Sequence, residues 1–283
     1  MLSILGVGHA HPKTVIDNAF LESLDIGTTN EWIMERVGIA TRYSVLPLDY
    51  IAKTRNQNPA AACEAAETNA VQLGAEAARQ AMQSAGISPA EIGMVVCGES
   101  IPHMLIPAHA CMIAGDLGIK APAFDLNSAC STFSAQLHFL NCLKEDKIPD
   151  YVLLIQTETY TMSLNYNDRT SAVLFGDGAA AQILSAKHPG KATISHSVFD
   201  SDPLSWKKIY TPPHGHFTQE GSAVQRFAIQ QTVKTFKQIN VENHAGKHLY
   251  FIGHQANLRM LETSRPISSR GRNPGGVDQE EGA

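Results

Sequence analysis

The sequence predicts an α/β protein in which helices pack against a sheet of buried strands. From residue 60 onward, segments of strong helix formers alternate with short apolar runs that contain few charged residues. Such alternation is typical of layered α/β folds, and uncharged runs are typical of strands that helices cover on both faces. With 43% apolar and 17% charged residues in 283, the composition fits one large globular domain or two smaller ones.

The N-terminal third begins with a strand-like run and continues with helices. Residues 2–8, LSILGVG, lack the basic start and the long apolar stretch of a signal peptide, so we expect them to form the first strand. Thr29 or Asn30 is expected to cap a short helix. Residues 60–85 are rich in alanine and end at Gly86, so one long helix is predicted there.

Strands and helices then alternate up to about residue 185. Strands are predicted at 94–100, 123–129, 151–159 and 171–184, and helices at 107–118 and 131–145. A second, shorter cycle is predicted to have a strand at 191–200, a helix at 221–239 and a strand at 248–253. The chain is therefore expected to divide into a first half, residues 1–185, and a partial second half, residues 186–262.

Residues 263–283 differ in composition from everything before them. The segment holds four glycines and two prolines and almost no large apolar side chains. Because such a segment buries too little apolar surface to offset the entropy of ordering, we expect a disordered tail.

Charge and cysteine usage exclude several classes of protein. A net charge of −5 gives no clustered basic surface for nucleic acid. No run of about 18 apolar residues is present, so no membrane span is predicted. The five cysteines form no CxxC pair, which argues against a zinc site and against a disulfide framework and favours the cytoplasm.

Cys130 is the strongest nucleophile candidate, because it stands where a predicted strand turns into a predicted helix. The unpaired N–H groups and the dipole of a helix start favour a thiolate and lower the pKa of the thiol. The same N–H groups can hold an oxyanion. The alternative is a small buried core residue, which is the expected role of the other four cysteines, Cys63, Cys97, Cys111 and Cys142.

His254 follows the predicted strand 248–253 and so also stands at a strand edge, where catalytic side chains of α/β folds collect. A histidine there can donate a hydrogen bond or carry a proton, and the alternative is an ordinary surface residue. His214 and His216 stand in a Pro/Gly loop without a third metal ligand, so we expect no metal site. Residues 175–181, FGDGAAA, lack the lysine of a P-loop and are expected to form a structural turn.

Four motifs in order resemble the β-ketoacyl-acyl carrier protein synthase III family of thiolase-fold condensing enzymes. They are TTNEWIMERVGIATR at 28–42, DLNSACSTF at 125–133, NDRTSAVLFGDGAAA at 167–181 and GHQANLR at 253–259. The resemblance covers residues 1 to about 262. It implies a duplicated αβαβα arrangement of layers with a truncated second half, no cofactor, and a homodimer.

The resemblance also implies the reaction and its residues. Cys130 would accept an acyl group from acyl-CoA, and His254 would stabilise the enolate formed when malonyl-acyl carrier protein loses CO2. Arg226 and Arg259 would offer positive charge to the acidic carrier protein. The residues expected along the CoA site are Thr28, Trp32, Arg36, Arg169, Gly221 and Asn257.

Three departures from the family pattern leave alternatives open. Thr132 replaces the small glycine after the A-C-S motif, and Ala180 replaces another glycine. The G-N-T/S-type helix start that supplies a third catalytic residue, an asparagine, in the family has no counterpart in residues 263–283. The resemblance therefore favours decarboxylating condensation, and the alternatives are acyl transfer without condensation and a catalytically silent subunit of a larger complex.

Overall fold

A mixed six-stranded sheet forms the centre of the computed structural model, which describes residues 1–102, 104–238 and 250–269. Its strand order is β5-β4-β6-β7-β1-β8. β4 is parallel to β5 and β6, whereas β7 is antiparallel to β6 and β1. The strands are β1 (Leu2–Ala10), β4 (Met94–Gly98), β5 (Ala123–Asp125), β6 (Val152–Glu158), β7 (Gly178–Ser185) and β8 (Ala192–Ile194). The predicted α/β class is confirmed.

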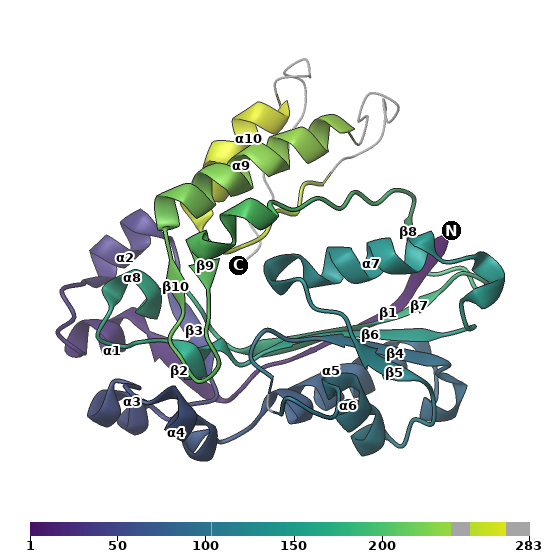
Figure 1. Cartoon of the computed structure of the whole chain (residues 1–283), viewed down its shortest axis with the longest axis horizontal. Coiled ribbons are helices and arrows are strands. Elements are labelled where there is room, and N and C mark those ends of the chain that lie inside the picture. Colours follow the sequence, from purple (N-terminus) through teal and green to yellow (C-terminus); the bar gives the residue numbers. More distant parts are fainter. Residues whose placement is uncertain (103, 239–249, 270–283) are drawn as a thin grey trace.

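Helices cover both faces of this sheet (Figure 1). α5 (Ala70–Ala85) and α6 (His109–Leu117) lie on one face, and α7 (Thr132–Cys142) lies on the other. Along β6 the side chains alternate accordingly, because Leu153 and Ile155 pack into the core under α5 while Val152 and Leu154 pack into the core under α7. Burial on both faces explains why β6 reads as a continuous apolar run.

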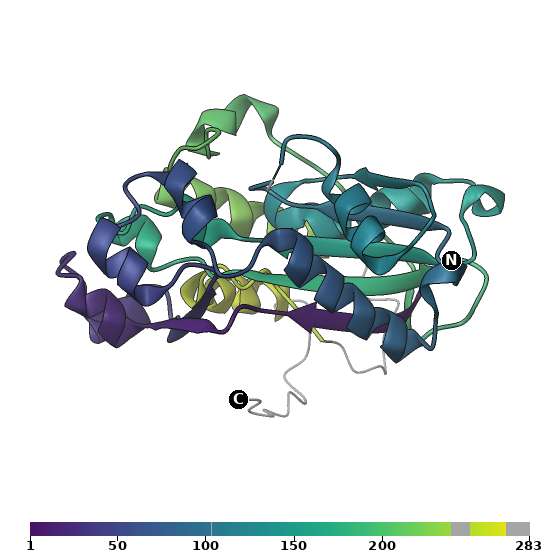
Figure 2. The same cartoon turned by 90° about the horizontal axis from the view of Figure 1, so that it is seen from below.

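α5 lies alongside β1 (Figure 2). This close packing depends on small residues on both sides. A side chain at Gly8 would lie 2.2 Å from the carbonyl oxygen of Ala77, and one at Gly6 would lie 2.5 Å from that of Ala81. The alanine-rich face of α5 therefore rests directly on the backbone of β1.

A peripheral group of elements lies at one end of the sheet (Figure 1). β2 and β3 pair antiparallel beside α1, α2 and α8, and α9 and α10 lie side by side above them. The remaining elements are β2 (Thr14–Asp17), α1 (Asn18–Ser23), α2 (Asn30–Arg36), β3 (Thr41–Ser44), α3 (Leu48–Thr54), α4 (Pro59–Ala65), η1 (Pro89–Glu91), η2 (Ala129–Ser131), η3 (Glu145–Lys147), η4 (Tyr160–Ser163), α8 (Arg169–Ala172), η5 (Pro203–Lys208), β9 (Ile209–Tyr210), β10 (Thr218–Gln219), α9 (Gly221–Gln238) and α10 (Leu258–Ser269).

The prediction of one long helix over residues 60–85 is wrong, because two helices occupy this stretch. Ala66 adopts an extended conformation after α4, and the N–H of Glu67 donates to the carbonyl oxygen of Val45 instead of continuing the helix. A capping box between Asn69 and Gln72 then starts α5. The cap on α2 was predicted correctly, since the Thr29 side chain accepts a hydrogen bond from the N–H of Trp32.

Two predicted strands also need correction. The strand expected at 171–184 begins only at Gly178, because Ser171 and Ala172 belong to α8. The segment 191–200 was expected to start a second cycle, but Ala192–Ile194 pairs antiparallel with β1 and extends the first sheet, because the outer edge of β1 is otherwise unpaired there. The division of the chain at residue 185 stays a prediction.

The end of the described chain differs from the expectation as well. Residues 250–253, part of the strand expected at 248–253, are not in a strand, and Tyr250 is 89% exposed, because no described strand lies beside them to pair with. α10 runs to Ser269, so the first seven residues of the expected disordered tail are helical. The Asn257 side chain accepts a hydrogen bond from the N–H of Met260 and caps this helix. The rest of the tail, residues 270–283, lies outside the described residues.

None of the helices in the described ranges is both long and apolar enough to span a bilayer.

Candidate active site

The carboxyl ends of three adjacent strands place several polar side chains at one edge of the sheet. Cys97 of β4 pairs with Asp125 of β5, and Gly98 of β4 pairs with Gln156 of β6, so these parallel strands end level with one another. Cys130 follows β5, Ser100 follows β4 and Glu158 ends β6. In open α/β sheets, the loops at such an edge are where ligands bind.

Cys130 lies in η2, the single turn that leads from β5 into α7. The preceding Ala129 has φ +46°, a left-handed conformation that costs a non-glycine residue energy. Asn127 holds it there by accepting a hydrogen bond from the Ala129 N–H at 3.0 Å. Strain that the surroundings maintain is typical of functional turns, and here it projects Cys130 from the start of a helix.

Thr132 fixes the same turn from below. Its hydroxyl accepts from the N–H of Ser128 at 2.9 Å and lies 3.0 Å from the Asn127 Oδ1, and the residue is buried. A side chain at Gly98 would lie 2.2 Å from the Thr132 Cγ2, so the methyl group packs on the β4 backbone. Thr132, which replaces the glycine of the family pattern, thus supports the turn from within the protein.

Three glutamine side chains hold α7 over the sheet. Gln136 of α7 is fully buried and donates to the carbonyl oxygens of Leu126 and Ile155, at 3.2 and 3.3 Å. Gln156 of β6 donates to Gln136 at 2.6 Å, and Gln182 of β7 donates to Gln156 at 3.0 Å. This chain of amides ties the helix that begins at Cys130 to the two central strands.

The electrostatic environment of Cys130 differs from the expectation. Burial of the thiol raises its pKa, and the charge of Glu158 raises it further, although the residue as a whole is exposed to solvent. The predicted lowering of the pKa by the helix start is therefore wrong in direction. Two unfavourable effects on the thiolate, desolvation and a nearby carboxylate, outweigh the one backbone hydrogen bond that favours it.

A cluster of buried carboxyl groups surrounds this edge, and sequence reasoning missed it. Burial raises the pKa of Glu99 to about 9 and that of Glu158 to about 7. The Glu99 carboxyl meets Nδ1 of His109, and both side chains are almost completely buried. Burial also lowers the pKa of His109, so the pair is neutral at physiological pH. The signal was present in the sequence as an acidic residue at the end of each of two apolar runs.

The other cysteines do not all behave as core residues. Cys97 is buried as expected, but Cys63, Cys111 and Cys142 are exposed, because each lies on a helix face that turns toward solvent. The Cys142 Sγ lies 3.7 Å from the Nε2 of His138 on the same helix.

Two residues expected along the CoA site meet at the peripheral end of the sheet. The guanidinium of Arg169 lies over the indole of Trp32, 4.9 Å from the ring centroid, and donates to the carbonyl oxygen of Gly27 at 2.5 Å. Thr28 is buried beside them, and its hydroxyl has no hydrogen-bond partner among the described residues. These contacts bring two separate motifs, 28–42 and 167–181, together.

The HQANLR motif packs against the end of α2. The N–H of Leu258 donates to the carbonyl oxygen of Val37 at 3.0 Å, and Asn257 donates to that of Arg36 at 3.3 Å. Arg259 donates to the carbonyl oxygen of Glu35 at 2.9 Å. These donors satisfy carbonyl groups that the last turn of a helix leaves unpaired.

His254 precedes these contacts and is exposed. Burial of its ring by neighbouring atoms nevertheless lowers its pKa, so the imidazole is neutral at physiological pH. No hydrogen bond joins His254 to Cys130 among the described residues. Of the remaining predicted site residues, Arg36, Gly221 and Arg226 are exposed, the last two on α9.

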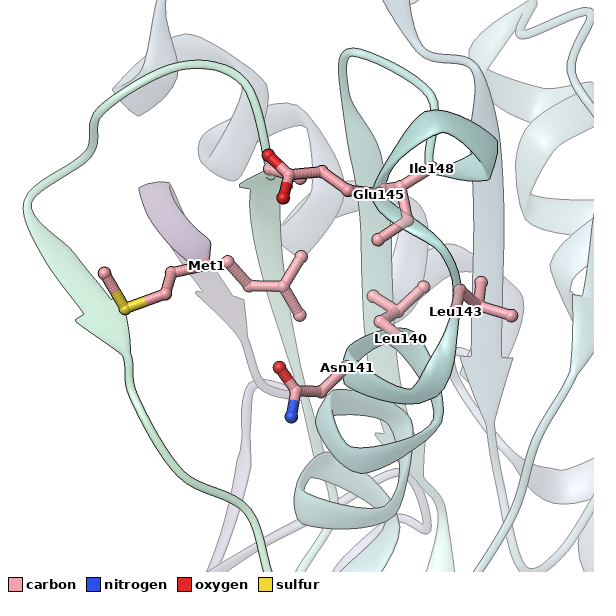
Figure 3. A pocket seen from close by; sticks show the side chains of 8 residues that line it. Met1, Leu140, Asn141, Leu143, Glu145 and Ile148 are labelled. Carbon is pink, nitrogen blue, oxygen red and sulfur yellow. The ribbon is translucent and has the colours of Figure 1, made fainter.

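A pocket lies at the opposite end of α7 from this site (Figure 3). Met1, Leu140, Asn141 and Ile148 are among its lining residues. It lies at the last turns of the 11-residue helix α7, about 15 Å along the helix axis from the turn that carries Cys130.

The fold and the motifs match known proteins. Residues 124–203 match the family model for 3-oxoacyl-[acyl-carrier-protein (ACP)] synthase III. A β-ketoacyl-[acyl-carrier-protein] synthase III of Coxiella burnetii is 32% identical over 274 residues, which are 92% of this chain and 79% of that protein. The crystal structure of 3-oxoacyl-[acyl-carrier-protein] synthase III from Aquifex aeolicus superposes with a TM-score of 0.81 at 25% identity, over 95% of this chain and 81% of that one. That from Pseudomonas aeruginosa gives 0.77 at 26% identity, over 94% and 79%.

Proposed function

Because this chain belongs to the 3-oxoacyl-[acyl-carrier-protein] synthase III family, we propose that Cys130 is the nucleophile of its acyl transfer and that His254 stabilises the condensation step. The chain is a thiolase-like condensing acyltransferase of fatty acid biosynthesis, which joins an acyl group from acyl-CoA to malonyl-acyl carrier protein. The observation that carries the residue assignment is the position of Cys130 in a strained turn at the start of α7, beside the carboxyl ends of β4 and β6.

The first step transfers the acyl group to the protein. The Cys130 thiol loses its proton, its sulfur attacks the thioester carbonyl, and CoA leaves as a thiol that carries a proton away. The carbonyl oxygen gains negative charge in the transition state. Unpaired N–H groups at the start of α7, together with its dipole, would stabilise that charge.

The second step joins two carbon chains. Malonyl thioester loses CO2, the resulting enolate carbon attacks the acyl carbonyl, and the Cys130 sulfur leaves and recovers a proton. A neutral imidazole can donate one hydrogen bond to the enolate oxygen, and the lowered pKa of His254 supports this state.

The CoA end is assigned to the peripheral group of elements. The face of Trp32 and the charge of Arg169 suit an adenine ring and its phosphates, and the Thr28 hydroxyl has a hydrogen bond to give to the base. Arg36, Gly221 and Asn257 complete the assignment along the nucleotide and the pantetheine. For the carrier protein, Arg226 is exposed on α9, and Arg259 also pairs with Glu262 at 2.8 Å.

Two properties of the whole protein belong to the same proposal. A homodimer is supported by the exposed apolar loop after β4, in which Leu105 and Ile106 are more than four-fifths exposed, and by β5, which is an edge strand of the sheet. A cytoplasmic location is supported by the five free cysteines, which a reducing compartment keeps unpaired.

Intact-protein mass spectrometry tests the assignment of the nucleophile. The protein is mixed with acetyl-CoA and with longer acyl-CoAs, and Cys130→Ala is treated in parallel. We expect an acyl mass on the wild-type protein that the variant lacks. An acyl mass that survives in Cys130→Ala would contradict the assignment. Adding malonyl-acyl carrier protein then separates condensation, which releases CO2 and a β-ketoacyl product, from transfer without carbon–carbon bond formation.

A further inference from the structure

Glu158 is a buried carboxyl group that the reaction described above does not use. It is the last residue of β6, and its carboxylate accepts hydrogen bonds from the backbone N–H of Ser100 at 3.1 Å and from the Ser100 hydroxyl at 2.7 Å. β6 lies in the interior of the sheet, so Glu158 stands at the middle of the edge at which Cys130 lies.

The strand register and the packing of α7 relate both Glu158 and Cys130 to Gly98. Glu158 is two residues beyond Gln156, which pairs with Gly98 across the sheet. Thr132, two residues after Cys130, packs its methyl group directly on Gly98 from the side of α7. Glu158 and Cys130 are therefore each two residues along the chain from a residue that contacts Gly98, where β4, β6 and α7 meet.

Titratable groups on several neighbouring elements interact electrostatically with Glu158. The charge of each group either affects the pKa of Glu158 or is affected by its charge, and the groups differ in protonation state at physiological pH. They are Cys97 of β4, Glu99 of the loop after β4, His109 of α6, Cys130 of η2, Tyr160 of η4 and Asp177 before β7.

Of the acidic groups at this edge of the sheet, Glu158 is the one suited to change the protonation state of Cys130. The pKa of Glu99 is raised to about 9, so that carboxyl stays neutral, and His109 stays neutral as well. Asp177, with a pKa of about 7, accepts hydrogen bonds from Val45 and Thr161 and has no resolved effect on the thiol. Glu158 also titrates at about 7, and its charge does raise the pKa of Cys130.

We propose that Glu158 is a positioning residue that acts through Cys130: its carboxylate opposes the thiolate, and its protonation releases the thiol for acyl transfer. The inference rests on Cys130 being the acyl-accepting nucleophile. The consequence is a coupled titration, in which one proton on Glu158 lowers the cost of removing another from the sulfur. A carboxyl that titrates near neutrality thereby makes the acylation rate respond less steeply to pH than an isolated thiol would.

The sign of the effect follows from the two pKa values. Below about pH 7, Glu158 is neutral and only burial opposes the thiolate. As the pH rises through 7, Glu158 becomes charged and the pKa of the thiol rises with it. The logarithm of the thiolate fraction should therefore rise by less than one unit per pH unit across this range.

The test measures the alkylation rate of each cysteine with iodoacetamide, which is neutral and needs no acyl-CoA site. Peptide mass spectrometry follows Cys130 and, as internal references, Cys63 and Cys111, both exposed. In Glu158→Gln we expect alkylation of Cys130 to be about three- to tenfold faster at about pH 8, because a like charge is removed, with the references unchanged. The slope of log rate against pH should return to one below the pKa of the thiol.

Two further variants keep the test decisive if Glu158→Gln folds poorly. Ser100→Ala removes one hydrogen bond that favours the Glu158 carboxylate, so Glu158 should titrate at a higher pH and Cys130 should react faster near neutrality. Glu158→Asp retains the charge and should keep the shallow wild-type profile.

Unchanged Cys130 rates in both Glu158→Gln and Ser100→Ala would overturn the inference. An acceleration shared equally by Cys63 and Cys111 would overturn it as well, because it reports a loosened fold and not a local charge. Failure of the proposed function is distinguishable, since it appears as missing acylation of Cys130 while the alkylation profile still depends on Glu158.

Discussion

At the scale of single residues, the protonation state of His254 separates the two steps of the reaction. Burial lowers the pKa of this imidazole, so at neutral pH it carries one proton and no charge. A neutral ring can donate a hydrogen bond to a forming enolate oxygen, but no hydrogen bond connects it to Cys130 among the described residues. We therefore propose that the acylation step relies on the turn at Cys130 and that His254 acts in the later step.

We accordingly expect His254→Ala to lose condensation and to keep acylation. The β-ketoacyl product should form about a hundredfold more slowly, because one donor to an oxyanion is worth about that factor. Acyl mass on Cys130 should appear at close to the wild-type rate. His196→Ala, at another exposed histidine, serves as the control and should change neither rate. Equal loss of acylation and condensation in His254→Ala would assign His254 to activation of the thiol instead.

The position of Cys130 could be predicted from the sequence, but its ionisation could not. A strand-like run followed by a helical one places the residue at a turn, and that information is local. Glu158 is 28 positions further along the chain and reaches the same edge only because β4 and β6 pair in parallel. The direction of the pKa shift depends on that pairing, so a reading of the helix start alone gave the wrong sign.

At the scale of elements, the contact of α7 with β4 determines the position of Cys130, the proposed nucleophile. Gly98 is the point of contact, because a side chain there would meet both the Thr132 Cγ2 at 2.2 Å and the Leu126 carbonyl oxygen at 2.7 Å. One of these atoms is backbone and the other belongs to a buried residue, so neither can move without shifting the turn that carries Cys130.

Gly98→Ala should therefore separate α7 from the sheet. We expect a loss of about 2 kcal/mol or more in the free energy of unfolding, as for other overpacked sites, together with slower acylation of Cys130. Gly115→Ala in α6 is the matched control, because a side chain there meets nothing within 4 Å. That substitution should leave stability unchanged or raise it by up to about 1 kcal/mol. Urea unfolding of both variants measures the difference, and equal stabilities would contradict the packing argument.

The break between α4 and α5 shows which part of element prediction fails and why. Helix propensity is high across residues 60–85, and it predicts one helix when summed over the window. The capping box at Asn69 and Gln72 is a readable start signal inside that window. The hydrogen bond from Glu67 to Val45 is not readable, since it needs the fold of residues 41–46 to be in place.

At the scale of the whole molecule, apolar surface lies on the loop that joins β4 to α6. Leu105 is 84% exposed and Ile106 is 83% exposed. The helix that follows the loop, α6, contacts both β4 and β5, and β5 is an edge of the sheet. An unpaired edge next to an apolar loop favours association with another chain. A second copy is the partner that the homodimer proposal requires.

Leu105→Asp should then weaken association without changing the fold. A charge buried in the contact between two copies carries a desolvation cost, so we expect the dissociation constant to rise at least tenfold. Leu204→Asp is the control, because Leu204 is 95% exposed in η5, outside this loop. Light scattering coupled to size exclusion, over a series of protein concentrations, reports the mass of each variant. A wild-type protein that stays monomeric at every concentration would contradict the homodimer. A Leu204→Asp variant that dissociates while Leu105→Asp does not would place the interface elsewhere. The loop begins with Glu99 and Ser100, directly after β4. Dissociation should therefore also alter the acylation rate of Cys130, and the measurements of mass and of acylation rate together would link assembly to the site.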